Sequence, residues 1–134
     1  MDDYAEAAQA AGIWSGLLLL LMVALSLLVV RQRQKHKVLL GHGDVPSLEL
    51  ASRAFGNAIE YVPAGMAGLA LLVLAGAEPS AVHVIGAMLL VGRVLHAFGL
   101  SRSSGVSVGR AGGMTLTWLA LVLLGLALIA YAVT

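Results

Sequence analysis

The chain of 134 residues has no cysteine and few charged side chains. Without cysteine it can form no disulfide, no catalytic thiolate of its own and no thiolate-based metal site. Any thiol chemistry must therefore use a thiol that a substrate supplies. Lysine, arginine, aspartate and glutamate make up only 11% of the residues, against about 25% in soluble domains. The net charge of +1 excludes a nucleic-acid role based on a basic surface.

Apolar residues are abundant instead, at 60% of the chain with a mean hydropathy of +0.94. A membrane-spanning helix needs about 20 predominantly apolar residues, and four segments meet this condition. We expect one all-α integral membrane domain over residues 1–134, built as a four-transmembrane-helix bundle. The expected helices cover residues 10–30, 54–77, 80–100 and 114–133.

Two segments have alternative interpretations. The first apolar run resembles the core of a cleaved signal peptide, but the preceding residues 2–6 are acidic rather than basic, which favours a retained helix. Gly41, His42, Gly43 and Asp44 are residue types found in phosphate or metal sites, yet they precede Pro46 and fit a flexible connection better.

The basic residues predict the orientation of the bundle. All eight lie in the connections at one end of the expected bundle or in the adjacent halves of its helices: Arg31, Arg33, Lys35, Lys37, Arg53, Arg93, Arg102 and Arg110. The positive-inside rule then places the 31–50 and 101–113 connections in the cytoplasm and both termini on the non-cytoplasmic side. The basic run at residues 31–37 is also of a kind that attracts anionic lipid.

Polar residues within the second and third segments are the candidate functional group. Arg53, Asn57 and Glu60 share one face of a helix, since they are four and three residues apart. Glu60 and Arg93 lie at similar distances along the chain from the 75–80 turn, and so do Asn57 and His96. We therefore expect Glu60 beside Arg93 and Asn57 beside His96.

A charge inside the hydrocarbon costs about 2.5–3.5 kcal/mol, so these side chains should face the bundle interior and pair. One interpretation is a Glu60–Arg93 ion pair that only fixes helix register. The set holds more polar groups than one pair needs, which favours a pocket for a charged, hydrogen-bonding ligand. His96 has no second histidine or carboxylate at ligand spacing, so we predict no metal site.

Three motifs carry a family resemblance. They are Arg53-x3-Asn57-x2-Glu60-x2-Pro63, the run Gly92-Arg93-Val94-Leu95-His96, and Arg110-Ala111-Gly112. Together with the four helices, they resemble the MAPEG family (membrane-associated proteins in eicosanoid and glutathione metabolism), and the short connections resemble its bacterial branch. The resemblance implies a homotrimer in the bacterial inner (plasma) membrane with glutathione as cosubstrate at subunit interfaces.

The same resemblance implies roles for individual residues. Glutathione would contact Arg53, Asn57, Glu60, Arg93 and His96. Arg110 would be the catalytic residue, because a nearby cation stabilises the thiolate that acts as nucleophile. The implied activity is that of a glutathione transferase or peroxidase acting on lipophilic electrophiles or lipid peroxides.

Two positions depart from several glutathione-using members, namely Gly56 in place of an arginine and Leu100 in place of a tyrosine. Whether the chain is an enzyme therefore stays open at the level of sequence. One alternative is a non-catalytic protein of the same fold that binds a lipid or lipophile. Another is a small transporter or proton relay that uses Glu60, Arg93 and His96.

Overall fold

A computed structural model of the protein describes residues 2–102 and 105–133, apart from the side chain of Ser101. These residues form four helices: α1 (Asp2–His36), α2 (Pro46–Leu74), α3 (Pro79–Arg102) and α4 (Val108–Val133). Each is long and apolar enough to cross a membrane. The prediction of an all-α chain with four such helices is confirmed.

The helices extend further than the hydropathy pattern indicated. α1 continues past residue 30 to His36, and α2 begins at Pro46 rather than at residue 54. Proline suits the first turn of a helix because its missing N–H has no partner there in any case. α4 begins at Val108 rather than at residue 114, so Arg110 belongs to its first turn and not to a connecting loop. Residues 103 and 104 of the expected 101–113 connection lie outside the described residues.

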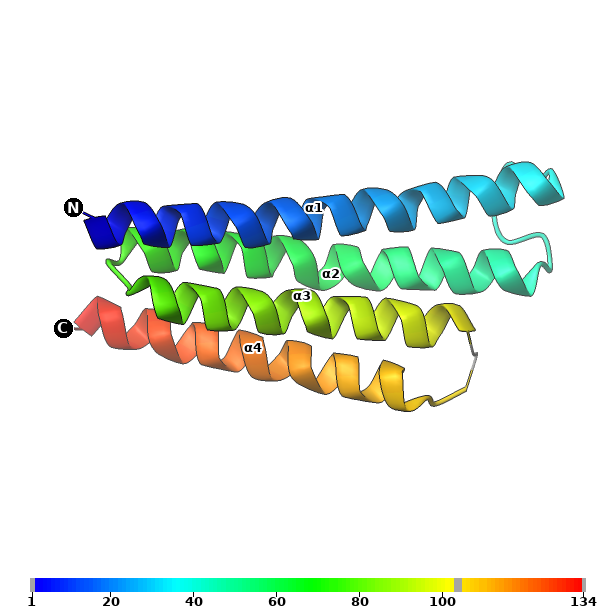
Figure 1. The fold of residues 1–134 in the computed structure, drawn as a ribbon. Coiled ribbons are helices and arrows are strands. Elements are labelled where there is room, and N and C mark those ends of the chain that lie inside the picture. The colour runs from blue at the N-terminus through cyan, green and yellow to red at the C-terminus, as the bar shows by residue number, and fades with distance from the viewer. Residues whose placement is uncertain (1, 103–104, 134) are drawn as a thin grey trace.

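Successive helices run in opposite directions (Figure 1). Both ends of the described chain and the turn between α2 and α3 lie at one end of the bundle, and the other two connections lie at the opposite end. α1 packs against α2 and α3, and α4 packs against the same two helices. Among the described residues, α1 and α4 make no contact with each other, so α2 and α3 form the centre.

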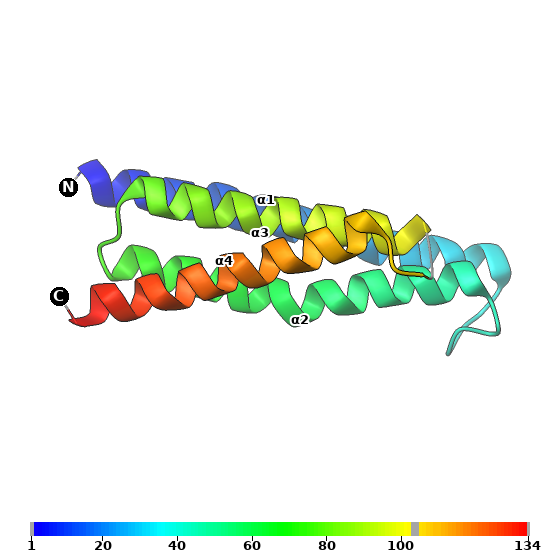
Figure 2. The ribbon, with the colours of Figure 1, turned by 90° about the horizontal axis from the view of Figure 1, so that it is seen from below.

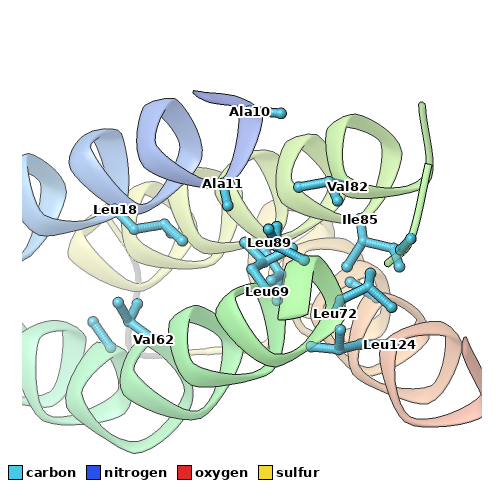
Figure 3. Close-up of a cluster of buried hydrophobic side chains, with 14 of the residues drawn as sticks. Ala10, Ala11, Leu18, Val62, Leu69, Leu72, Val82, Ile85, Leu89 and Leu124 are labelled. Atoms are coloured by element: carbon cyan, nitrogen blue, oxygen red, sulfur yellow. The ribbon is translucent and has the colours of Figure 1, made fainter. Parts of the chain in front are cut away.

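The apolar core runs along the bundle, and its largest leucines lie toward the middle and toward the end that contains the termini. Buried leucines from α1, α2 and α3 meet there, among them Leu18, Leu69 and Leu89 (Figure 3). Gly68 of α2 lies so close to Leu124 of α4 that a Cβ would collide with the leucine side chain. The core cluster continues into the half of the bundle that contains Arg53, Asn57 and Glu60, where it includes Leu25, Ala54, Ala58, Ala97 and Leu100.

α4 crosses the bundle obliquely (Figure 2). Its C-terminal half lies beside α2, as the contact between Gly68 and Leu124 shows, whereas its N-terminal half lies against α3. The first halves of α2 and α4 diverge in this view, and side chains from both helices line the hollows of the candidate site described below.

Candidate functional site

Glycines bring the backbones of α3 and α4 into direct contact at the site. A Cβ at Gly99 would collide with the backbone nitrogen of Arg110, and a Cβ at Gly113 would collide with that of His96. Small residues at spacings of four allow such close helix approach in membranes, and Gly109 and Gly113 supply that spacing on α4. The contact fixes the start of α4, and hence Arg110, against the α3 turn that carries His96.

Ser107 caps the N-terminus of α4. Its hydroxyl accepts a hydrogen bond from the backbone N–H of Arg110 at 3.2 Å, and its carbonyl accepts one from Ala111 at 2.9 Å. Serine is a favoured residue at this position because it satisfies N–H groups that have no partner within the helix. Arg110 thus adds its charge to the positive end of the α4 dipole, and the site gains an electropositive wall.

Arg93 is the most deeply buried cation of the described residues, with 2% of its surface exposed. Its Nη1 donates to Asn57 Oδ1 at 2.6 Å and its Nε donates to Thr117 Oγ1 at 3.0 Å. Its Nη2 lies 3.6 Å from the sulfur of Met114, and its guanidinium lies over the ring of Tyr61, 5.1 Å from the centroid. Four side chains from α2 and α4 therefore hold Arg93 in place.

The expected ion pair between Glu60 and Arg93 is wrong for this chain. Glu60 is exposed and has no cationic partner within 4.0 Å among the described residues. Asn57, one helical turn earlier, takes the position beside Arg93 instead. The ion pair recorded in the described part of the chain joins Arg53 to Glu49 on the α2 surface, at 3.1 Å.

Five of the six predicted site residues meet at one hollow of about 230 Å³, here called the polar hollow. It is lined by Arg53, Gly56, Asn57, Glu60, His96, Leu100 and Arg110. Asn57 and His96, which we expected side by side, both line this hollow, while the side-chain oxygen of Asn57 accepts a hydrogen bond from Arg93. Arg93 is the exception, since it is not among the lining residues and lies behind Asn57.

A second, larger hollow of about 470 Å³ adjoins the first and is mostly apolar. It is lined by Asn57, His96, Val106, Arg110, Ala111, Met114, Thr115 and Trp118. We call it the apolar hollow. A third, of about 350 Å³, lies where α2 begins and is lined by Pro46, Glu49, Leu50, Arg53, Leu100 and Arg110. Arg110 lines all three hollows and is thus the central residue of the site.

The sequence interpretation missed several residues of the site. Thr117 is buried and donates to the carbonyl of Gly113 at 2.8 Å while it accepts from Arg93. A polar residue in an otherwise apolar span was the available signal, because such residues usually find a partner in the bundle. Trp118 donates to the hydroxyl of Tyr61 at 3.4 Å. The positions of these two residues along the chain gave no indication of this contact between α4 and α2.

The arrangement suits an anionic ligand that also carries a positive group. The polar hollow is lined by two arginines, Arg53 and Arg110, and by a single carboxylate, that of Glu60. Arginine binds carboxylates through two parallel hydrogen bonds, and a carboxylate accepts hydrogen bonds from an ammonium group. The apolar hollow beyond Arg110 suits a lipophilic molecule. Among the described residues, no group of histidine and acidic side chains could hold a metal ion.

Comparison with known proteins agrees with this architecture. Residues 11–130, which span all four helices, match the model of the MAPEG family. The chain is 38% identical over 108 residues to the inner membrane protein YecN of Escherichia coli K12, and the match covers 81% of each chain. YecN of Escherichia coli O6:H1 matches with the same identity and coverage. With its four membrane-length helices, the protein is a multi-pass membrane protein. The chain belongs to the MAPEG family, and its relatives include a bacterial member.

Proposed function

We propose that the protein binds glutathione in the polar hollow and uses its thiol on lipophilic electrophiles or lipid peroxides. One observation carries the proposal: Arg110 lines both the polar and the apolar hollow. A thiol beside Arg110 would face a hydrophilic binding site on one side and an apolar one on the other. A thiol transferase or peroxidase with a lipophilic second substrate needs this arrangement.

The polar hollow offers partners for the charged ends of glutathione, which carries two carboxylates and one ammonium. Arg53 would bind a carboxylate and Glu60 the ammonium. Arg53 pairs with Glu49 in the structure, and its side chain is 64% exposed. Exposed ion pairs contribute little free energy, so Arg53 can exchange Glu49 for a ligand carboxylate at low cost.

Arg110 would stabilise the thiolate, which is the reactive form of the thiol. Its guanidinium and the N-terminus of α4 both favour a negative charge at this place. Arg93 would act at a distance from the ligand. It holds the oxygen of Asn57, which leaves the amide N–H₂ of Asn57 to donate to a ligand in the hollow.

Assembly and orientation belong to the same proposal. We infer a homotrimer with glutathione bound between neighbouring copies, because Glu60 is exposed on the single chain and a second copy would enclose the hollow. We also infer the bacterial inner membrane, in agreement with the name of YecN. The basic residues favour a cytoplasmic location for the end that carries the α1–α2 connection, which leaves both termini on the other side.

Thiolate absorbance in the ultraviolet tests the function directly. Detergent-solubilised protein is titrated with glutathione at neutral pH, and binding is measured in parallel by equilibrium dialysis. We expect bound thiolate with the wild type, and bound glutathione without thiolate for Arg110→Ala. Arg102→Ala serves as the control, because Arg102 is exposed at the same end of the bundle and lines none of these hollows.

Two other outcomes would overturn the enzymatic proposal. Glutathione bound by the wild type without thiolate would leave a binding protein that presents a lipid or lipophile rather than a transferase. If neither binding nor thiolate is observed, glutathione is not the ligand.

A further inference from the structure

The connection between α1 and α2 is an ordered turn that doubles back on α1. Lys37 adopts a left-handed conformation with φ 56°, and the N–H of Val38 donates to the carbonyl of Arg33 at 3.1 Å. This bonding pattern ends a helix and reverses the direction of the chain. Residues 38–40 therefore run back beside the last turn of α1, and Figure 2 shows the connection projecting to the side of the helices before α2 begins.

Arg33 holds the returning chain. Its Nη1 donates to the carbonyls of Val38, Leu39 and Gly41, at 3.5, 3.2 and 3.1 Å. Among the described residues, Nε and Nη2 of Arg33 have no acceptor, so two donor groups remain for a ligand. Arg33 thus holds the turn through neutral carbonyl groups, and no carboxylate of the described residues neutralises its charge.

The turn presents two leucines to the outside. Leu39 is 91% exposed and Leu40 is 88% exposed. A hollow of about 460 Å³ adjoins Leu39 and is lined by Arg33, Gln34, Lys37, Val38 and Leu39. Two cations and two apolar side chains thus line the same hollow. An exposed apolar pair beside cations is unfavourable in water but fits a surface that has both anionic and apolar parts.

The length of α1 places this turn at the surface of the bilayer. A helix of 35 residues is about 52 Å long at 1.5 Å per residue, whereas the hydrocarbon core is about 30 Å thick. The apolar run ends at Val30, so the last turns of α1 extend into the headgroup layer. There the chain reverses and brings Leu39 and Leu40 back toward the hydrocarbon.

The charge of this segment has one sign. Four basic residues occupy alternate positions of this segment: Arg31, Arg33, Lys35 and Lys37. No acidic residue occurs between Glu6 and Asp44. A phosphate with a net negative charge is attracted to such a cluster. A zwitterionic headgroup has a weaker electrostatic attraction to this cluster, because its ammonium group is repelled by the same side chains.

From these contacts we propose that the α1–α2 turn is a binding site for an anionic phospholipid. The phosphate lies against Arg33 and Lys37, and the acyl chains contact Val38, Leu39 and Leu40. The site is separate from the polar hollow and does not depend on the function proposed for it, because the two share no lining residue.

The absence of cysteine allows a direct measurement. A single cysteine introduced by Leu40→Cys carries a polarity-sensitive fluorophore in the full chain, reconstituted in phosphatidylcholine bilayers with or without phosphatidylglycerol. His42→Cys is the matched control within the turn, and Val108→Cys is the control for an exposed apolar residue at the start of α4, which lines none of the hollows described above. We expect the label at position 40 to show a blue-shifted emission and strong quenching by nitroxide-labelled lipids. Labels at positions 40 and 42 that are quenched equally by aqueous iodide would overturn the insertion of the leucines.

Native mass spectrometry tests the choice of lipid. We expect the wild type to retain phosphatidylglycerol in preference to phosphatidylcholine. Lys37→Gln keeps the hydrogen bonds of Arg33 and should lose this preference, whereas Arg102→Gln, an exposed arginine at the same end, should keep it. Equal retention of both lipids by the wild type would overturn the proposal. So would displacement of phosphatidylglycerol by glycerol phosphate at equal concentration, because the site would then bind the phosphate alone.

Discussion

Asn57 on α2 accepts a hydrogen bond of 2.6 Å from Nη1 of Arg93 on α3. This contact joins the two central helices at the depth of the candidate site. It also gives different structural roles to Arg93 and Asn57, which the sequence motifs grouped together as ligand contacts. Arg93 lies buried behind the hollow and positions Asn57, whereas Asn57 lines the hollow itself.

The first prediction compares Arg93 with Glu60. Arg93→Leu removes the donor to Asn57 and the donor to Thr117. We expect it to lower the free energy of unfolding by about 1.5–3 kcal/mol, the range for a hydrogen bond to a charged group. Glu60→Gln removes no ion pair of the described chain, so it should lower the stability of the single chain less than Arg93→Leu does. The midpoint of unfolding in a detergent titration measures both. A Glu60→Gln variant as unstable as Arg93→Leu would show that the two residues pair after all.

A second prediction concerns the contact between α3 and α4. Gly113→Ala inserts a methyl group into backbone atoms of His96 and Gly92, and overpacking of this kind costs about 1–3 kcal/mol. The neighbouring Gly112→Ala meets nothing within 4 Å and should be neutral or stabilising, by up to about 1 kcal/mol. The same unfolding titration distinguishes them. Equal stability of the two variants would contradict the close packing of α3 and α4.

The sequence predicted the number of helices because each span is a long apolar run. It also predicted which halves of α2 and α3 lie side by side, since depth follows from counting residues from a short turn. It could not predict rotation about the helix axis. Asn57 and Glu60 differ by three residues, or about 60° around an ideal helix, and that difference decides which of them faces Arg93.

The start of α4 was misjudged for a different reason. The expected boundary followed hydropathy, whereas the helix begins six residues earlier, at Val108 after the Ser107 cap. Glycine and serine in the 101–113 segment indicated a loop, yet Gly109 and Gly113 belong to α4 and make its close contact with α3. Tertiary packing overrides local propensity here, and it brings Arg110 onto a rigid helix.

Assembly is the third prediction. The outer faces of α1 and α4 expose many large apolar residues, and Glu60 of α2 is exposed without a cationic partner within 4.0 Å in the described chain. An intramembrane carboxylate normally faces another protein surface or a water-filled cavity. We expect native mass spectrometry in mild detergent to give three times the chain mass of 13.8 kDa. A monomer at all protein concentrations would contradict the trimer and the enclosure of the hollow by a second copy.

Trp118 provides a fourth prediction, about the second substrate. It lines the apolar hollow but not the polar one, so Trp118→Ala should weaken the use of lipophilic substrates and leave glutathione affinity unchanged. The expected sign is a raised KM for the lipophile, measured at saturating glutathione. Leu119→Ala is the matched control, because Leu119 is exposed on the same helix and lines neither hollow. If Trp118→Ala and Leu119→Ala changed the KM for the lipophile equally, the apolar hollow would not be its binding site.

The last prediction separates ligand binding from surface electrostatics at Arg53. Arg53→Ala removes a cation from the polar hollow and should weaken glutathione affinity by about 1.5–3 kcal/mol, the range for a hydrogen bond to a charged group, or about 10- to 150-fold in Kd. Glu49→Gln releases Arg53 from its surface partner and should leave the affinity unchanged or slightly higher. Equilibrium dialysis with labelled glutathione at fixed ionic strength measures both variants. If Glu49→Gln weakened binding as much as Arg53→Ala, the ion pair itself would be the structural requirement, and Arg53 would not be a ligand contact.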